Sequence, residues 1–240
     1  NASETIKRLL ETHETFRNDY SAYKRRIYFN NWTPCEYGQK KDEHGFNAFK
    51  KESFFDEVYS ICPYTNKWLN TLDLKQQYKD IFYPFHRKLI PQAHDKEYDV
   101  IYHGGLHGEE HIDCLKVMSN FNYRYCTMTH NINKLTRHVG SKYATNFDLP
   151  FQEKINLIAQ TKASVCYNLV HLTPSHVEGI KSYDNWSENE AFSNIDDLKF
   201  MPQFKTRMHE AAISRTINLV YKDNWNIAEK YFIHLLLISK

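Results

Sequence analysis

The sequence has few of the residues that break regular secondary structure, with 7 Gly and 7 Pro among 240 residues. This scarcity argues against a β-sandwich, which needs many tight turns. The five cysteines are odd in number and include no Cys-x-x-Cys pair. Their pattern argues against a disulfide framework and against a structural zinc site. We therefore expect reduced thiols and a cytoplasmic location.

The sequence also lacks an excess of charge of either sign, because 31 Lys and Arg residues face 29 Asp and Glu residues, which leaves a net charge of +2. Without a strongly basic field we expect no nucleic-acid partner. The longest apolar run, residues 231–238, is interrupted by His234 and is far shorter than the roughly 20 residues that span a bilayer. We expect no transmembrane segment.

Strand-like apolar runs alternate with helical patterns along most of the chain. This alternation predicts an α/β fold with βαβ units and a parallel sheet flanked by helices. We expect strands at residues 25–29, 55–62, 98–102, 123–128, 163–170 and 216–221, and helices at 3–20, 64–74, 107–120, 151–161, 202–214 and from 226. Residues 171–200 are expected to form a long polar loop.

A domain boundary is expected where Pro84 and Pro91 punctuate a stretch that resembles a linker. We accordingly predict a small N-terminal unit at residues 1–92 and a larger C-terminal unit at residues 93–240.

A glycine turn follows the predicted strand at residues 98–102, in the run His103-Gly104-Gly105. Ligands bind at the carboxyl ends of parallel strands, where glycines let the backbone approach a phosphate and the next helix offers free N–H groups. The run Gly-Gly-x-x-Gly is not the Gly-x-Gly-x-x-Gly fingerprint of dinucleotide-binding folds. A plain turn between strand and helix is the alternative interpretation.

The same segment holds a candidate metal motif, because His107-Gly-Glu-Glu110-His111 fits the pattern His-x-x-Glu-His. On a helix, both histidines would share a face with Glu110 nearby. A zinc-dependent amidohydrolase or carboxypeptidase-like enzyme would need a third ligand, and His130, His171 and His176 are the candidates. With 13 His in the chain, such a motif also arises by chance on a surface helix.

A second cluster of charged residues comprises Lys205, Arg207 and Glu210, at the start of the helix that we expect Pro202 to open. Arg207 could neutralise a diphosphate bidentately and Lys205 could do so as a point charge. Glu210 could accept hydrogen bonds from two ribose hydroxyls. The alternative is an amphipathic helix whose charges are solvated.

The run Lys205-Thr-Arg207-x-x-Glu210-Ala-Ala, followed by a strand and then Asp223-Asn-Trp225, resembles the donor-site region of GT-B glycosyltransferases of the exostosin-like and group-1 kinds. Residues 55–64 resemble the end of the N-terminal domain of these enzymes, and residues 96–105 resemble the opening strand and glycine turn of their nucleotide-sugar domain. Pro202 and Gln203 stand where retaining members carry a further glutamate, so the resemblance leaves retaining and inverting chemistry open.

This resemblance implies two Rossmann-like units in a GT-B-like fold, with a reduced acceptor-side unit at residues 1–92 and a nucleotide-sugar-binding unit at residues 93–240. It implies transfer of a sugar from a UDP- or GDP-sugar to a glycan or other hydroxyl acceptor. The implied catalytic residues are Arg207 and Glu210. The implied donor-binding residues are His103, Gly104, Gly105, Lys205, Arg207 and Glu210.

The resemblance also implies no cofactor and a metal-independent site, which is consistent with the absence of an Asp-x-Asp motif from the chain. Candidates for the base that deprotonates the acceptor are Glu36, His103 and His171. Trp186 and Phe192 are candidates for stacking on a sugar or base. A non-catalytic module that binds a nucleotide or carbohydrate is a further alternative.

Overall fold

The computed structural model describes residues 8–30, 55–71, 77–92, 94–105, 109–128, 146–182 and 194–220. The chain divides into two compact units. The first comprises Asn1–Ile81, Leu169–Phe204 and Trp225–Lys240, and the second comprises Phe82–Asn168 and Lys205–Asn224. Each unit therefore combines segments that are distant in the sequence.

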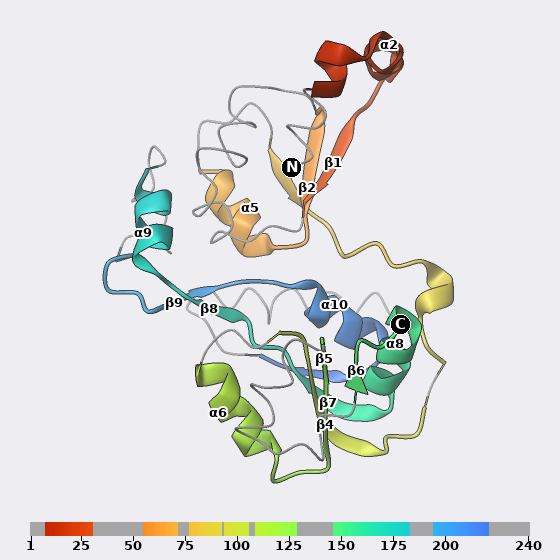
Figure 1. The fold of residues 1–240 in the computed structure, drawn as a ribbon, viewed down its shortest axis with the longest axis vertical. Helices are drawn as coiled ribbons and strands as arrows, with labels where there is room; N and C mark the ends of the chain where they lie inside the picture. The colour runs from red at the N-terminus through yellow and green to blue at the C-terminus, as the bar shows by residue number, and fades with distance from the viewer. Residues whose placement is uncertain are drawn as a thin grey trace. The chain divides into compact units, whose positions relative to one another are not determined.

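The second unit is built on a parallel five-stranded sheet with the strand order β10-β7-β4-β5-β6 (Figure 1). The chain adds β5 and β6 on one side of β4, and then β7 and β10 on the other side, so the winding reverses next to β4. Residues Val100 to His103 of β4 are buried, as expected for a central strand that is covered on both faces. The strands are β4 (Tyr98–His103), β5 (Tyr123–Thr127), β6 (Asn146–Phe147), β7 (Thr161–Val165) and β10 (Ile217–Leu219).

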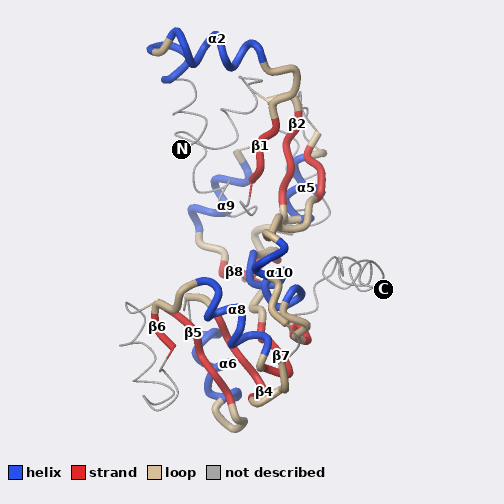
Figure 2. Tube along the Cα trace, turned by 90° about the vertical axis from the view of Figure 1, so that its right-hand side faces the viewer, coloured by secondary structure: helices blue, strands red, loops and turns tan. Residues whose placement is uncertain are grey.

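In the described part of the chain, the helices that flank this sheet are α6 (Glu109–Met118), α8 (Phe151–Ala159) and α10 (Thr206–Ile213). Right-handed crossovers place helices on opposite faces when the winding reverses. Accordingly, α8 and α10 pack together, and α6 covers the other face (Figure 1 and Figure 2). Each helix buries an apolar side toward the sheet, with Leu115 of α6, Ile155 of α8 and Met208 of α10 at most 1% exposed. A short 3₁₀ turn, η1 (Arg87–Leu89), precedes β4 in this unit.

The first unit contains a parallel three-stranded sheet with the order β1-β2-β3. Pro63 begins the helix between β2 and β3, where its fixed φ suits the first helical turn and its missing N–H is not needed. The elements are α2 (Glu14–Ala22), β1 (Ile27–Asn30), β2 (Glu57–Ser60), α5 (Pro63–Leu69) and β3 (Tyr78–Asp80).

A later segment completes the first unit through the antiparallel pair β8 (Leu169–His171) and β9 (Phe200–Pro202), with α9 (Pro174–Lys181) between them. Leu172, Ile180 and Met201 from this segment share one hydrophobic core with Phe55 and Trp68. This shared core is the physical reason why Leu169–Phe204 belongs to the first unit.

The predicted α/β class with helices flanking parallel sheets is confirmed. The division into units differs from a single boundary after residue 92, since the second unit begins at Phe82 and the chain returns to the first unit at Leu169–Phe204. None of the described helices is long and apolar enough to cross a membrane.

Between residues 163 and 214, the local structure differs from the expectations. The strand expected at residues 163–170 is two strands in different sheets, because β7 ends at Val165 and β8 begins at Leu169. Pro202 ends β9 instead of opening the next helix, which begins at Thr206. The polar loop expected at residues 171–200 contains α9, whose start is marked by the pair Thr173-Pro174, an N-cap followed by proline.

Candidate functional site

The second unit contains a cavity of about 740 Å³ at the carboxyl edge of its sheet. This volume falls in the range of small-molecule sites. The position matches the edge where doubly wound sheets bind ligands, beside the reversal of the winding. The cavity is lined by His103, Gly104 and Gly105 after β4, by Cys126, Thr127 and Met128 of β5 and its end, by Asp148 and Leu149 after β6, by Phe151 and Lys154 of α8, and by Lys205, Thr206, Arg207 and Glu210 at the start of α10.

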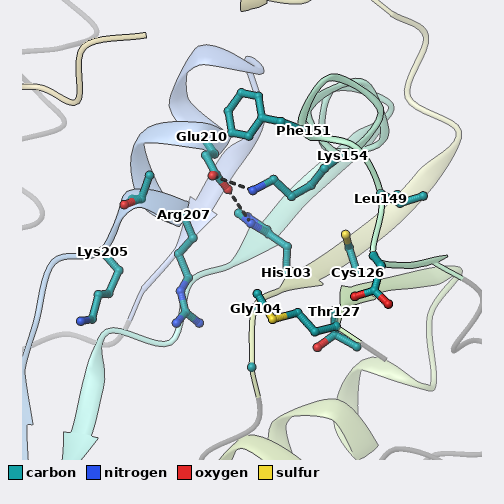
Figure 3. A pocket seen from close by; sticks show the side chains of 14 residues that line it. His103, Gly104, Cys126, Thr127, Leu149, Phe151, Lys154, Lys205, Arg207 and Glu210 are labelled. Atoms are coloured by element: carbon teal, nitrogen blue, oxygen red, sulfur yellow. Dashed lines mark hydrogen bonds and ion pairs between the residues drawn. The ribbon is translucent and has the colours of Figure 1, made fainter. Parts of the chain in front are cut away.

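Gly104 directly follows β4 and has a conformation that favours glycine, with a φ of +135°. A Cβ atom at this position would lie 3.1 Å from Nη1 and 3.2 Å from Cζ of Arg207, which is inside ordinary van der Waals contact. The missing side chain therefore allows the guanidinium group to lie directly against the backbone (Figure 3). The N–H of Gly104 donates to the carbonyl of Cys126 at 3.0 Å, so it extends the sheet and is not available to a phosphate.

Two buried tyrosines fix this turn and the arginine beside it. The Tyr102 hydroxyl donates to the carbonyl of Gly105 at 2.8 Å and accepts from Nη1 of Arg207 at 3.2 Å. The Tyr125 hydroxyl donates to the carbonyl of Gly104 at 3.2 Å. Burial raises the pKa of both phenols, so they remain neutral donors. The hydrogen bond to Tyr102 restricts the orientation of the Arg207 guanidinium group, and Tyr125 fixes the adjacent glycine turn.

The Glu210 carboxylate is 7% exposed and has partners on both oxygens. Oε1 accepts from Lys154 Nζ at 2.7 Å, and Oε2 accepts from His103 Nδ1 at 3.2 Å (Figure 3). Burial alone would raise the pKa of Glu210, but the hydrogen bond from His103 and the charge of Lys154 outweigh it and lower the pKa to about 2. Glu210 is therefore ionised at neutral pH.

His103 lies at the end of β4 and is 2% exposed. Its Nε2 atom lies 3.0 Å from the hydroxyl of Ser164 in β7. Burial lowers the pKa of His103 against the opposing effect of Glu210, which favours the neutral ring. Because the carboxylate can only accept, Nδ1 carries the proton and Nε2 accepts from Ser164. With both nitrogens engaged, His103 is not positioned to take a proton from an acceptor.

Two helices begin at the cavity and direct the positive ends of their dipoles toward it. Lys205 is the N-cap residue of α10, and Phe151 is the first residue of α8. Peptide N–H groups at such ends favour an anionic ligand. Lys205 and Arg207 extend in the same direction from the start of α10 (Figure 3). The cavity thus concentrates positive charge on one side.

Met128, Leu149 and Phe151 contribute apolar side chains to the lining of the cavity. Burial raises the pKa of the Cys126 thiol to about 11, so it is protonated at neutral pH and is a poor nucleophile. The lining therefore combines cationic and apolar side chains, a combination that suits a ligand with an anionic group attached to a flat ring.

The structure brings together all six residues predicted to bind a donor, since His103, Gly104, Gly105, Lys205, Arg207 and Glu210 line one cavity. Sequence reasoning missed Lys154 and Tyr102, which contact Glu210 and Arg207. Nothing in the sequence distinguishes Lys154 from a solvated lysine of an amphipathic helix. Tyr102 was recognisable only as a strand residue.

The other candidate residues do not join this cavity in the described part of the chain. His111 is buried on α6, with its ring 4.1 Å from that of Tyr167, and His171 and His176 belong to the first unit. No group of three metal-ligating side chains occurs among the residues that the structure describes. Glu110 lies in α6, but its side chain is outside the described part, as are residues Glu36, His107, His130, Trp186 and Phe192.

No protein-family model matches the chain, and no curated protein or solved structure matches it. The residues of the cavity themselves therefore carry the functional conclusion.

Proposed function

We propose that the chain is a glycosyltransferase that moves a sugar from a nucleoside-diphosphate donor, a UDP- or GDP-sugar, to a glycan or another hydroxyl acceptor. In this proposal the second unit binds the donor, as in a GT-B-like fold. The observation that carries it is the packing of Arg207 against Gly104 at the carboxyl edge of the sheet, with Lys205 beside it in the same cavity. Two cations in one cavity, one of them an arginine fixed against the backbone, suit a diphosphate.

The chemistry expected of this site is stabilisation of the leaving diphosphate. Negative charge increases on the diphosphate as the bond to the sugar breaks, and fixed cations lower the energy of that transition state. Arg207 is held by Tyr102, so little reorganisation is needed when the charge develops. Removal of one such preorganised donor typically costs about 10²–10³ in rate.

Glu210 is assigned to the ribose of the donor. Each of its oxygens accepts one hydrogen bond within the protein, and an ionised carboxylate has about four acceptor positions. It can therefore still accept from two adjacent hydroxyls. The proposal includes metal independence, which rests on the absence of an Asp-x-Asp motif from the sequence and on the cations that the protein itself supplies.

Binding of UDP and GDP, measured as a shift of the melting temperature with and without Mg²⁺, tests this proposal. A ligand at about 100 times its Kd stabilises the native state by roughly 2.7 kcal/mol. We expect a shift for one of the two nucleotides without metal, and its loss in Arg207→Ala and Glu210→Ala. Lys162→Ala is the matched control, because Lys162 is an exposed cation of β7 that does not line the cavity.

Donor hydrolysis then separates an enzyme from a binding module. Release of free sugar from the matching UDP- or GDP-sugar, abolished by Arg207→Ala, supports the transferase. A full thermal shift in both Arg207→Ala and Glu210→Ala would show that the nucleotide does not bind in this cavity.

A further inference from the structure

The Lys154–Glu210 ion pair joins two helices across the cavity and has no counterpart in the motif that pointed to the site. Lys154 comes from the first turns of α8, 56 positions before Glu210 in the chain. Its side chain is 24% exposed and lines the cavity, whereas the carboxylate that it contacts is 7% exposed. Lys154 therefore links the cavity wall to the buried Glu210 carboxylate, and its charge can influence the ionisation and orientation of that carboxylate.

Lys154 is the full positive charge that compensates Glu210 among the described residues. The other partner of the carboxylate, His103, is neutral and donates a hydrogen bond through Nδ1. Arg207 directs its guanidinium group to Tyr102 instead. Loss of one partner from a buried ion pair leaves an uncompensated charge, which is far more costly than loss of an exposed pair.

The charge balance of the cavity also depends on this lysine. The charged lining residues are three cations and two anions, namely Lys154, Lys205, Arg207, Asp148 and Glu210. With Lys154 cancelling Glu210, the charged lining residues that remain are Lys205, Arg207 and Asp148, whose net charge is positive and attracts an anionic ligand. Without Lys154, the Glu210 carboxylate would repel any anionic group in the same cavity.

We propose that Lys154 is a positioning residue that acts through Glu210, holding the carboxylate ionised and aimed at the hydroxyls of the ligand while cancelling its repulsion of the diphosphate. This inference rests on the proposed function, since the ligand is taken to be a nucleoside diphosphate. It assigns to α8 a part in binding that the charged segment of α10 does not provide by itself.

A pH profile distinguishes this role from a merely structural one. In the native protein the Glu210 charge does not change near neutral pH, so it contributes no pH dependence to nucleotide affinity there. In Lys154→Met, the uncompensated His103–Glu210 pair takes up a proton at higher pH, as a coupled unit. The titratable and charged groups around Glu210 are His103 of β4, Cys126 of β5, Lys154 of α8, Cys166 after β7 and Arg207 of α10.

The experiment compares Lys154→Met, Lys154→Arg, Glu210→Gln and the double variant Lys154→Met/Glu210→Gln with the unaltered protein. The affinity for UDP and GDP is measured by calorimetry from about pH 5 to about pH 8, the range in which a histidine–carboxylate pair titrates. We expect Lys154→Met to weaken binding about tenfold or more at the upper end, equivalent to the loss of about 1.4 kcal/mol, and to acquire a pH dependence. Because the terminal phosphate of the nucleotide also titrates in this range, the profiles are compared with that of the unaltered protein. Lys154→Arg should restore that profile, and the double variant should lose the added pH dependence.

A titration of the His103 and Glu210 side chains by NMR, without nucleotide, separates failure of this inference from failure of the proposed function. If the pair takes up its proton at the same pH in Lys154→Met as in the unaltered protein, the inference is overturned, whether or not nucleotides bind. If the titration shifts upward but the unaltered protein binds neither UDP nor GDP, the proposed function is overturned and the control of Glu210 by Lys154 stands. Unaltered affinity and an unaltered pH profile in Lys154→Met overturn the role in binding.

Discussion

The substitution Gly104→Ala tests how closely the cavity depends on the absence of one side chain. Gly104 has a φ of +135°, and a non-glycine residue forced into such a conformation costs roughly 1–3 kcal/mol. In addition, the new Cβ atom would lie 3.1 Å from Nη1, 3.2 Å from Cζ and 3.5 Å from Nη2 of Arg207. Carbon atoms in favourable contact are separated by roughly 3.5–4.0 Å, so the guanidinium group must retreat by a few tenths of an ångström.

Two effects are therefore expected from Gly104→Ala. The free energy of unfolding should fall by about 1–3 kcal/mol, which corresponds to roughly 2–4 °C in melting temperature for each kcal/mol in a chain of this length. Nucleotide affinity should fall as well, because Arg207 would leave the position in which Tyr102 holds it. Thermal denaturation and calorimetry measure the two effects separately.

A double-mutant cycle with Arg207→Ala isolates the contact from the backbone strain. If the steric argument is correct, Gly104→Ala should cost less stability in the Arg207→Ala background, where only the strain at φ remains. Gly179→Ala in α9 is a control for the added methyl group, since among the described glycines only Gly104 has a φ in the left-handed region. A Gly104→Ala protein with unaltered melting temperature and unaltered nucleotide affinity would refute the reasoning.

Three further predictions concern Glu210, the two tyrosines and two buried thiols. The pKa of Glu210 is lowered to about 2, which corresponds to a contribution on the order of 3 kcal/mol to the free energy of unfolding. This contribution should be fully present above the pKa of an unfolded glutamate and should be lost as the pH falls from there toward 2. Glu210→Gln should remove that part of the acid dependence in chemical denaturation, and an unchanged acid limb would contradict it. Tyr102→Phe and Tyr125→Phe each remove one hydrogen bond to a glycine carbonyl and should each cost about 1 kcal/mol of stability, but only Tyr102→Phe should weaken nucleotide binding; equal losses of affinity would contradict this. The pKa values of the Cys126 and Cys166 thiols are both raised to about 11, so these thiols should be alkylated slowly in the native protein at pH 8, where an ordinary thiol with a pKa of roughly 8.5 is partly ionised. Mass spectrometry measures the rate of alkylation, and labelling as fast as in denaturant would contradict this prediction.

The sheet of the second unit was largely predictable because its strands are apolar runs separated by amphipathic helices. The expected strands at residues 98–102 and 123–128 correspond to β4 and β5, with ends that differ by one residue. The failures occurred where one apolar run serves two sheets, as in residues 163–170. Alternation of apolar residues is a local property, and it does not record which neighbouring strand will accept the backbone hydrogen bonds.

The candidate site was predictable where its chemistry is concentrated in short segments. Arg207 and Glu210 share one helix turn, and Gly104 follows a recognisable strand, so their residue types already indicated an anion-binding edge. Lys154 was not predictable in this way, since a lysine on an amphipathic helix is usually a solvated side chain. Only the packing of α8 against α10 places its ammonium group 2.7 Å from a buried carboxylate.

The sequence is sufficient to predict the α/β class, the scarcity of turns, the balanced charge and the grouping of charged residues at the start of α10. These properties depend on residue type and on spacing along the chain. The tertiary structure alone decided that Gly104 makes room for Arg207, that Tyr102 holds the guanidinium group, and that Leu169–Phe204 completes the core of the first unit. Each of these depends on contacts between segments distant in the sequence, and such contacts form only when the sheet and its helices are assembled.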